Sequence, residues 1–130
     1  MSRQISPAGD EYFALRTFRR DGSPVSTPIW LAPARGYLYA YTPCRSWKVR
    51  RIRHDPKVEI APSNFAGEPH GQWRSGHARV LSVTELRIAK RAMTEKYGNK
   101  FRWFTLITLI GRPRKNGGRA VGLEIRLDSV

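Results

Sequence analysis

Hydrophobic and polar positions alternate with a period of two along most of the first third of the chain, which predicts β-strands. Residues 11–20 and 24–32 are two such segments, and the Asp21-Gly22 pair between them is typical of a tight turn that joins antiparallel strands. Because proline cannot donate a hydrogen bond to a neighbouring strand, Pro28 predicts that the second segment lies at a sheet edge or forms a bulge.

Four further segments are expected to be strands. In residues 120–130, Val121, Leu123, Ile125 and Leu127 would share one face of the sheet. Gly76, inside the segment of residues 72–82, suggests a bulge or the close approach of another backbone. The four segments are residues 37–42, 57–62, 72–82 and 120–130.

After the strand predicted at residues 37–42, the spacing of hydrophobic positions changes from two to three residues, which predicts a short helix. Ser46 is a favourable N-cap, and Val49 and Ile52 place two apolar side chains three positions apart on one side. The Asp55-Pro56 pair should end this helix, because the residue before a proline avoids the helical region.

A second helix is predicted over residues 85–98. Thr84 is expected to cap its beginning, Gly98 to end it, and Leu86, Ala89 and Met93 to form its buried stripe. Residues 101–111 are apolar all round, so their pattern fits either a helix or a strand.

About six strands joined by tight turns, with two or three helices, favour a mainly β protein built as an antiparallel β-barrel with α-helices. The 130 residues are enough for one domain, so we expect a single domain over residues 1–130 with a flexible N-terminus at residues 1–10.

The charge of the chain is unusual. It has 24 Lys and Arg against 10 Asp and Glu, a formal net charge of +14, which attracts anions: nucleic acid, an acidic membrane face, or a phosphorylated or carboxylated small molecule. No helix-turn-helix or RNP-like aromatic motif accompanies the charge, so nucleic acid is the least favoured of these partners.

Cysteine usage and apolar runs bear on the compartment. The single cysteine, Cys44, cannot form an internal disulfide, which is typical of a reducing cytoplasm. Residues 1–10 lack the apolar run of a signal peptide, and the longest apolar stretch is too short to span a bilayer. We therefore expect a soluble cytoplasmic protein with no membrane partner.

The predicted short helix carries the most suggestive chemistry. Its N-terminus offers unpaired backbone N–H groups and partial positive charge to an anion, with the Ser46 hydroxyl beside them. Lys48 lies in the first turn, Arg51 lies one turn further along, and Arg45 precedes the cap. These groups could converge on one dianion; the alternative is a solvated basic face.

The order of these elements resembles the split-barrel flavin-binding superfamily named for pyridoxamine 5'-phosphate oxidase. The resemblance rests on TFRRDGSPVSTPIWLAP at 17–33, YLYAYTPCRSWKVRRIRHDPKVEIAPSN at 37–64 and GQWRSGHARVL at 71–81, and it extends from Tyr12 to Leu127. Within the superfamily, the sequence is most similar to the small actinobacterial branch that uses a deazaflavin, coenzyme F420.

The resemblance implies a six-stranded antiparallel split β-barrel that forms a homodimer with the cofactor at the interface. By position, Ser46 and Lys48 match the phosphate contacts of the family. The residues that match the strands beside the ring system are Thr27, Pro28, Ile29, Trp30 and Trp73. Ordinary core packing is the alternative for the two tryptophans.

The function implied is an F420-dependent oxidoreductase that transfers a hydride between the deazaflavin and a small unsaturated or quinone-like molecule. A cofactor carries such chemistry, so catalytic motifs are not required, and no G-x-S-x-G, H-E-x-x-H or Walker motif is present. The three histidines, His54, His70 and His77, do not have metal-binding spacing. Three alternatives remain open: an FMN-dependent oxidase or reductase of the same fold, a non-enzymatic binder of a cofactor or haem, and a nucleic-acid-binding protein. The density of positive charge favours the cofactor with the longer anionic tail over FMN.

Overall fold

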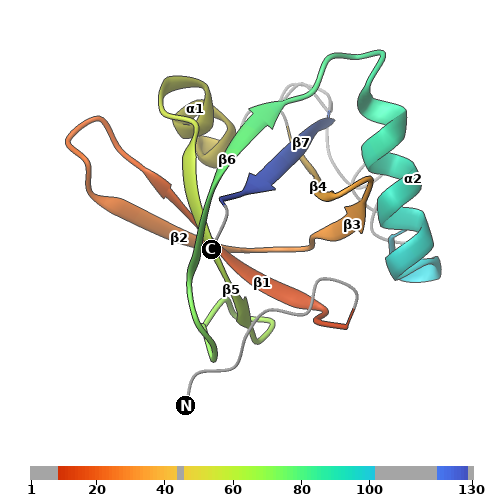
Figure 1. Ribbon diagram of the computed structural model, residues 1–130, viewed down its shortest axis with the longest axis horizontal. Coiled ribbons are helices and arrows are strands. Elements are labelled where there is room, and N and C mark those ends of the chain that lie inside the picture. The colour runs from red at the N-terminus through yellow and green to blue at the C-terminus, as the bar shows by residue number, and fades with distance from the viewer. Residues whose placement is uncertain (1–8, 44–45, 102–119, 129–130) are drawn as a thin grey trace, which may run out of the picture.

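The computed structural model describes residues 9–43, 46–101 and 120–128. In this part of the chain, seven strands and two helices follow one another (Figure 1). They are β1 (Tyr12–Phe18), β2 (Pro24–Ile29), β3 (Ala32–Ala34), β4 (Tyr37–Pro43), α1 (Trp47–His54), β5 (Lys57–Ser63), β6 (Arg74–Val80), α2 (Leu86–Tyr97) and β7 (Ala120–Leu127).

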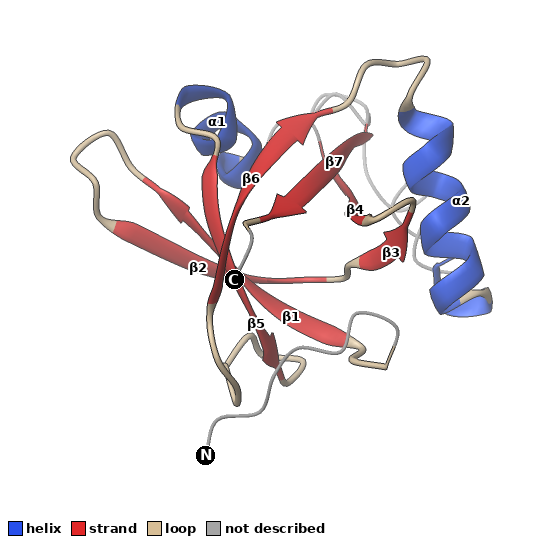
Figure 2. Ribbon diagram, viewed as in Figure 1, coloured by secondary structure: helices blue, strands red, loops and turns tan. Residues whose placement is uncertain are grey.

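The strands form one antiparallel sheet in the order β2-β1-β5-β6-β7-β4-β3. The two edge strands, β2 and β3, are consecutive in the sequence, and only Trp30 and Leu31 separate them. Since an extended chain advances at most about 3.5 Å per residue, the two edges lie within about 10 Å of each other at this point. The sheet therefore curls into a nearly closed barrel (Figure 2).

The strand count differs from the prediction of six because residues 24–32 do not form one strand. The segment bends at Trp30 and Leu31, so that its first part pairs with β1 and its last part pairs with β4. The prediction that Pro28 lies in an edge strand is confirmed, because β2 pairs with β1 alone.

Alternate side chains of the strands fill the barrel with a hydrophobic core. Strands β1, β5 and β7 contribute fully buried pairs, among them Phe13 with Leu15 and Leu123 with Ile125. Ile52 of α1 joins this core from outside the sheet, as its predicted inward position requires. Close packing of these side chains fixes the positions of the strands that border the candidate site.

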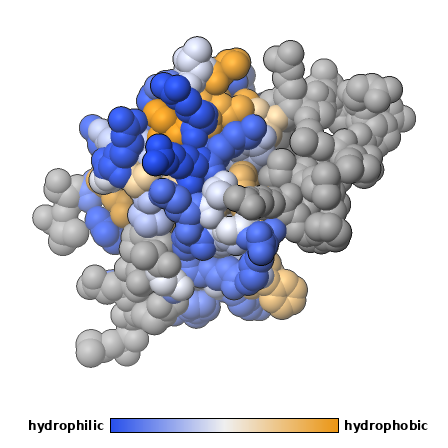
Figure 3. All heavy atoms as spheres, turned by 90° about the vertical axis from the view of Figure 1, so that its right-hand side faces the viewer, coloured by the Kyte–Doolittle hydropathy of each residue, from blue (hydrophilic) through white to orange (hydrophobic). Residues whose placement is uncertain are grey.

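A second hydrophobic cluster lies between α2 and the outer face of β3 and β4. It contains Tyr39 of β4 and, from α2, the buried residues Ala89, Met93 and Tyr97. The two helices thus cover different sides of the barrel, with α1 against β1 and β6 (Figure 1). Figure 3, which looks onto α2, shows that the described residues on this side present a predominantly hydrophilic surface.

The ends of α1 are those predicted. The Ser46 hydroxyl accepts a hydrogen bond from the backbone N–H of Val49 at 3.4 Å, and Asp55 terminates the helix with extended backbone angles. Val49 and Ile52 are buried on its inner side. The buried side chains therefore fix the orientation of this helix, and with it the directions in which its basic side chains can point.

The predicted cap of α2 is wrong. The helix begins after Glu85, without a side-chain cap from Thr84. The turn before it is closed by Ser82 and Glu85: the Ser82 hydroxyl accepts the N–H of Glu85 at 3.3 Å, and the Glu85 carboxylate accepts the N–H of Ser82 at 2.9 Å. These reciprocal bonds are those of a capping box, and the Ser-x-x-Glu spacing is readable in the sequence. Gly98 ends the helix as predicted, with a positive φ of 56°.

Gly76 has the close backbone contact that its place in a strand suggested. A Cβ atom at this position would lie 2.5 Å from the carbonyl oxygen of Arg126 on β7. Because that oxygen belongs to the backbone of a paired strand, it cannot move aside cheaply.

Among the described residues, no helix combines the length and the apolar composition needed to cross a bilayer.

Candidate functional site

Four of the predicted site residues meet at one pocket of about 300 Å³. Pro28 and Ile29 from β2, Trp30 from the bend and Lys48 from α1 all line it, and we call it the Lys48 pocket. The remaining lining residues are Tyr12, Tyr41, Thr42, Phe65, Met93 and Phe101. The pocket therefore joins the end of β2, the first turn of α1 and the inner face of α2.

The aromatic wall of the Lys48 pocket, Trp30, is supported by packing against α2. The Trp30 ring stacks on the Tyr97 ring of α2 with centroids 4.7 Å apart and an interplanar angle of 12°. The Tyr97 hydroxyl accepts the N–H of Leu31 at 3.2 Å and lies 2.6 Å from the carbonyl oxygen of Glu11, and burial raises the pKa of Tyr97 well above its usual range. Trp30 thus has both roles considered for it, since one face packs on α2 while the residue lines the pocket.

The loop after β5 contributes a lining residue that sequence reasoning missed. Its first residue, Asn64, accepts the N–H groups of Ala66 and Glu68 at 3.0 Å each, which folds the loop into a compact turn. Gly67, with a φ of +89°, packs directly against Pro28. This arrangement places Phe65 at the pocket with 76% of its surface exposed.

Among the described residues, Lys48 is the one cationic side chain that lines this pocket. Burial lowers its pKa, and the charge of Arg51 lowers it further. Within residues 9–43, 46–101 and 120–128, the ammonium group has no hydrogen-bond acceptor and no carboxylate partner. A partly desolvated charge without a counter-ion is costly, and an anionic ligand group would offset that cost.

Thr27, which precedes the pocket residue Pro28 in the sequence, carries a second polar group without a partner among the described residues. Its hydroxyl oxygen is buried and has no hydrogen-bond partner among the described residues. Buried hydroxyl groups are normally hydrogen-bonded, so this one is a candidate donor to a ligand or a water molecule beside Pro28. Thr27 itself does not line the Lys48 pocket.

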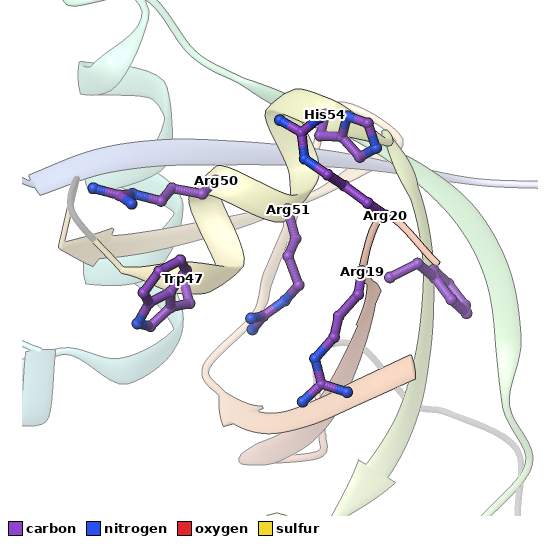
Figure 4. A pocket seen from close by; sticks show the side chains of 7 residues that line it. Arg19, Arg20, Trp47, Arg50, Arg51 and His54 are labelled. Carbon is purple, nitrogen blue, oxygen red and sulfur yellow. The ribbon is translucent and has the colours of Figure 1, made fainter. Parts of the chain in front are cut away.

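Three other basic residues of α1 line a different pocket. Arg50, Arg51 and His54 line a second pocket of about 570 Å³ together with Phe18, Arg19, Arg20 and Trp47 (Figure 4), which we call the basic pocket. The Arg51 Nε–H donates to the Thr17 hydroxyl at 2.5 Å, and this bond holds the side chain in its place. Lys48 and Arg51 therefore line two neighbouring pockets, although their charges interact, and their predicted convergence on one anion stays a prediction.

Of the two remaining predicted residues, only Trp73 belongs to the described part of the chain. The Trp73 ring lies under the guanidinium of Arg16, which is 3.8 Å from the ring centroid and forms an ion pair with Glu59. Trp73 lines neither pocket, so its cofactor contact stays a prediction. Arg45 lies outside the described residues, as do Cys44 and all but the first residue of the ambiguous segment 101–111.

The histidines do not form a metal centre in the part of the chain that the structure describes, where no group of three His, Cys, Asp or Glu side chains could hold an ion. His77 pairs with Asp128 at 3.2 Å on the surface. His54 lines the basic pocket. His77 lines neither pocket.

Comparison with known proteins supports the fold at the level of structure. No protein-family model and no curated protein sequence matches the chain. Among solved structures, a protein of unknown function from Agrobacterium tumefaciens matches with a TM-score of 0.69 at 13% identity. The match covers 92% of this chain and 49% of that protein, so the chain spans about half of its length.

Cofactor-binding proteins are among the similar structures. An FMN-binding protein from Nostoc punctiforme, related to pyridoxamine 5'-phosphate oxidase, matches with a TM-score of 0.61 at 19% identity, over 90% of this chain and 70% of that protein. An F420 reductase matches with a TM-score of 0.56 at 17% identity, over 95% of this chain and 90% of that protein. A haem storage protein from Vibrio cholerae and an FAD-binding protein from Mesorhizobium loti also share the fold. The chain therefore has the split-barrel fold of the pyridoxamine 5'-phosphate oxidase-like proteins, which confirms the predicted fold class.

Proposed function

We propose that the protein is an oxidoreductase that holds a flavin-type cofactor in the Lys48 pocket. Coenzyme F420 is the favoured cofactor, and a small unsaturated or quinone-like molecule is the favoured substrate. The observation that carries the proposal is the meeting of a braced aromatic wall with a half-buried ammonium group that has no partner among the described residues. The FMN-binding, FAD-binding and F420-dependent proteins that share the fold support it.

The residues present fit such a cofactor. Trp30, Pro28 and Ile29 offer a flat, mostly apolar surface to a ring system, and Lys48 offers a positive charge to a phosphate or another anionic group. About 300 Å³ is the lower end of the size range of ligand pockets. The pocket would thus enclose the ring, while the remainder of the cofactor extends beyond its mouth.

The chain's own residues would bind the cofactor, orient its ring and shield it from water. When bound, a reduced deazaflavin or flavin supplies the hydride, so the protein needs no nucleophile. Stacking on Tyr97 keeps Trp30 from rotating, which fixes one wall for the ring. Burial raises the pKa of Tyr41, so its hydroxyl stays protonated and can donate a hydrogen bond in the pocket. Phe65 at the mouth can exclude water.

The charge of the chain favours F420 over FMN. A deazaflavin with a phosphodiester and an oligoglutamate tail carries several negative charges, whereas FMN carries one phosphate. A surface with a formal net charge of +14 attracts the more highly charged ligand more strongly. The haem alternative is less favoured for this pocket, because neither His nor Cys is among the described residues that line it, Cys44 lying outside them.

We further propose a homodimer with the cofactor at the interface. Phe65 at the Lys48 pocket and Trp47 at the start of α1 are large aromatic residues with 76% and 66% of their surface exposed. Aromatic side chains are enriched in protein interfaces, so both suit burial by a second copy. Sedimentation equilibrium with and without cofactor tests this: a monomer under both conditions would contradict it.

Titration of the cofactor-free protein tests the proposed function. Tryptophan fluorescence is followed as F420, FMN or haem is added, because Trp30 lines the pocket. We expect saturable quenching by F420 at lower concentrations than by FMN, and oxidation of reduced F420 by a quinone in the presence of the protein. Tighter binding of FMN would favour the FMN-dependent alternative, and saturation by neither flavin would refute the proposal.

A further inference from the structure

The basic pocket gathers the side chains of four arginines and one histidine in a concave site. Arg19 and Arg20 come from the turn between β1 and β2, and Arg50, Arg51 and His54 come from α1. Figure 4 shows the side chains of Arg19 and Arg51 extending toward the same space beneath the helix. Among the described residues, neither Asp nor Glu lines the pocket.

Neutral groups hold three of these arginines in place. The Arg51 Nε–H donates to the Thr17 hydroxyl at 2.5 Å, and an Arg19 terminal nitrogen donates to the Ser23 hydroxyl at 3.2 Å. The Arg50 guanidinium lies 4.8 Å from the centroid of the Trp47 ring. Each of these contacts is made to a neutral group, although the Asp21 carboxylate, which accepts a hydrogen bond from the Ser23 hydroxyl, lies within electrostatic reach of Arg19. Among the described residues, no carboxylate forms an ion pair with any arginine of this pocket.

Such an arrangement is unfavourable without an anion. Burial lowers the pKa of Arg51, and the charge of Arg19 lowers it further, which places the two guanidinium groups within electrostatic reach of each other. Guanidinium groups present paired N–H donors whose geometry matches phosphate and carboxylate oxygens. A ligand with at least two negative charges would relieve the repulsion and use the nitrogens that the neutral contacts leave free.

We propose that the basic pocket is a second ligand site, separate from the Lys48 pocket, for a small organic polyanion. The two pockets share no lining residue, so this inference does not rest on the proposed function. Phe18 and Trp47 add apolar walls for the carbon body of the ligand, and about 570 Å³ lies within the range of small-molecule sites. Clustered oxyanions are the chemistry required, and phosphate esters and polycarboxylates both supply them.

Calorimetric titration with pyrophosphate and with citrate tests the proposal and distinguishes these two sources. We expect saturable binding of at least one. The Arg19→Gln, Arg51→Gln double variant should weaken it at least about tenfold, because each lost contact is a charge-assisted one. The matched control is Arg87→Gln, Arg91→Gln, which removes two charges from the exposed side of α2. It should change affinity little, since exposed charges are screened over about 10 Å at 0.1 M salt.

Circular dichroism confirms the fold of each variant. If Arg51→Gln disturbs the fold, the Arg19→Gln, Arg20→Gln pair in the exposed turn carries the same test. Saturation by neither probe, or equal losses in the test and control variants, overturns the proposal. Competition between pyrophosphate and a flavin, or loss of pyrophosphate binding in Lys48→Met, also overturns it, because one site would then serve both ligands. A single-stranded oligonucleotide that binds far more tightly than either probe would identify a nucleic-acid surface instead.

Discussion

A Lys48→Met substitution should weaken cofactor binding while leaving the free protein at least as stable as before. Methionine keeps most of the side-chain length and removes the charge. If Lys48 contacts an anionic group of the cofactor, the lost charge-assisted contact is worth about 1.5–3 kcal/mol, which raises the Kd roughly 10- to 150-fold. The free protein, by contrast, loses an ammonium group that is half-buried and has no partner among the described residues. Its free energy of unfolding should therefore stay constant or rise.

Fluorescence titration gives the Kd, and urea unfolding without ligand gives the stability. Arg53→Met is the matched control, because Arg53 lies on the same helix, is exposed and lines neither pocket. The pH dependence adds a second readout. Since burial lowers the pKa of Lys48, affinity should fall with rising pH earlier than for an ordinary lysine, and this step should be missing in Lys48→Met. An unchanged Kd in a folded Lys48→Met protein would remove Lys48 from the cofactor site.

Three further predictions concern stability. Gly76→Ala should destabilise the protein by about 3 kcal/mol or more in urea unfolding, because its Cβ would lie 2.5 Å from a backbone oxygen of β7; a cost under about 1 kcal/mol would contradict this. Ser82→Ala should cost about 1 kcal/mol through loss of the bond to the Glu85 N–H, and Thr84→Ala should cost less; the reverse order would restore Thr84 as the cap. Burial lowers the pKa of Lys96 from 10.5 to about 8, so between these values the unfolded chain binds a proton that the folded protein does not. The stability of the wild type should therefore rise across this pH range relative to Lys96→Met, and parallel pH profiles would show that Lys96 titrates normally.

Local rules predicted the elements that border the site. Ser46, Val49, Ile52 and Asp55 defined α1 correctly, because capping and a three-residue apolar spacing depend on neighbours within one turn. The edge position of β2 followed from Pro28 for the same kind of reason, since a missing N–H limits pairing wherever the strand lies. These features required no knowledge of the remainder of the chain.

Features set by distant residues could not be predicted. The bend at Trp30 and Leu31 arises because β2 and β3 pair with different strands, and the Tyr97 hydroxyl that accepts the Leu31 N–H lies 66 residues away. An alternating pattern continues through such a bend without a signal. The misplaced cap of α2 is a different kind of error, because the Ser82-x-x-Glu85 spacing was present and Thr84 was preferred to it.

The same distinction explains why Lys48 and Arg51 line different pockets. Helical spacing puts Lys48 and Arg51 on neighbouring positions of α1, which favours convergence. The direction of the Arg51 side chain, however, is set by Thr17, a residue of β1 that lies 34 positions earlier in the sequence. Phe65 was missed for a similar reason, since its position depends on how the Asn64 side chain folds its loop.

Net charge and contact chemistry therefore act at different ranges in this molecule. Charges within about a Debye length reinforce one another in attracting an anion, so the Lys48 pocket and the basic pocket share one attractive field near α1. Hydrogen bonds act only at about 3 Å, and at that range the two pockets present different donors: one ammonium beside aromatic walls, and several guanidinium groups held by neutral partners. A charge removed from either pocket should slow the encounter with any anion, whereas it should shorten the lifetime only of the complex whose ligand it touches. Measured association and dissociation rates for Lys48→Met and Arg51→Gln would separate these two effects, and dissociation rates that change together for both ligands would contradict a division into two sites.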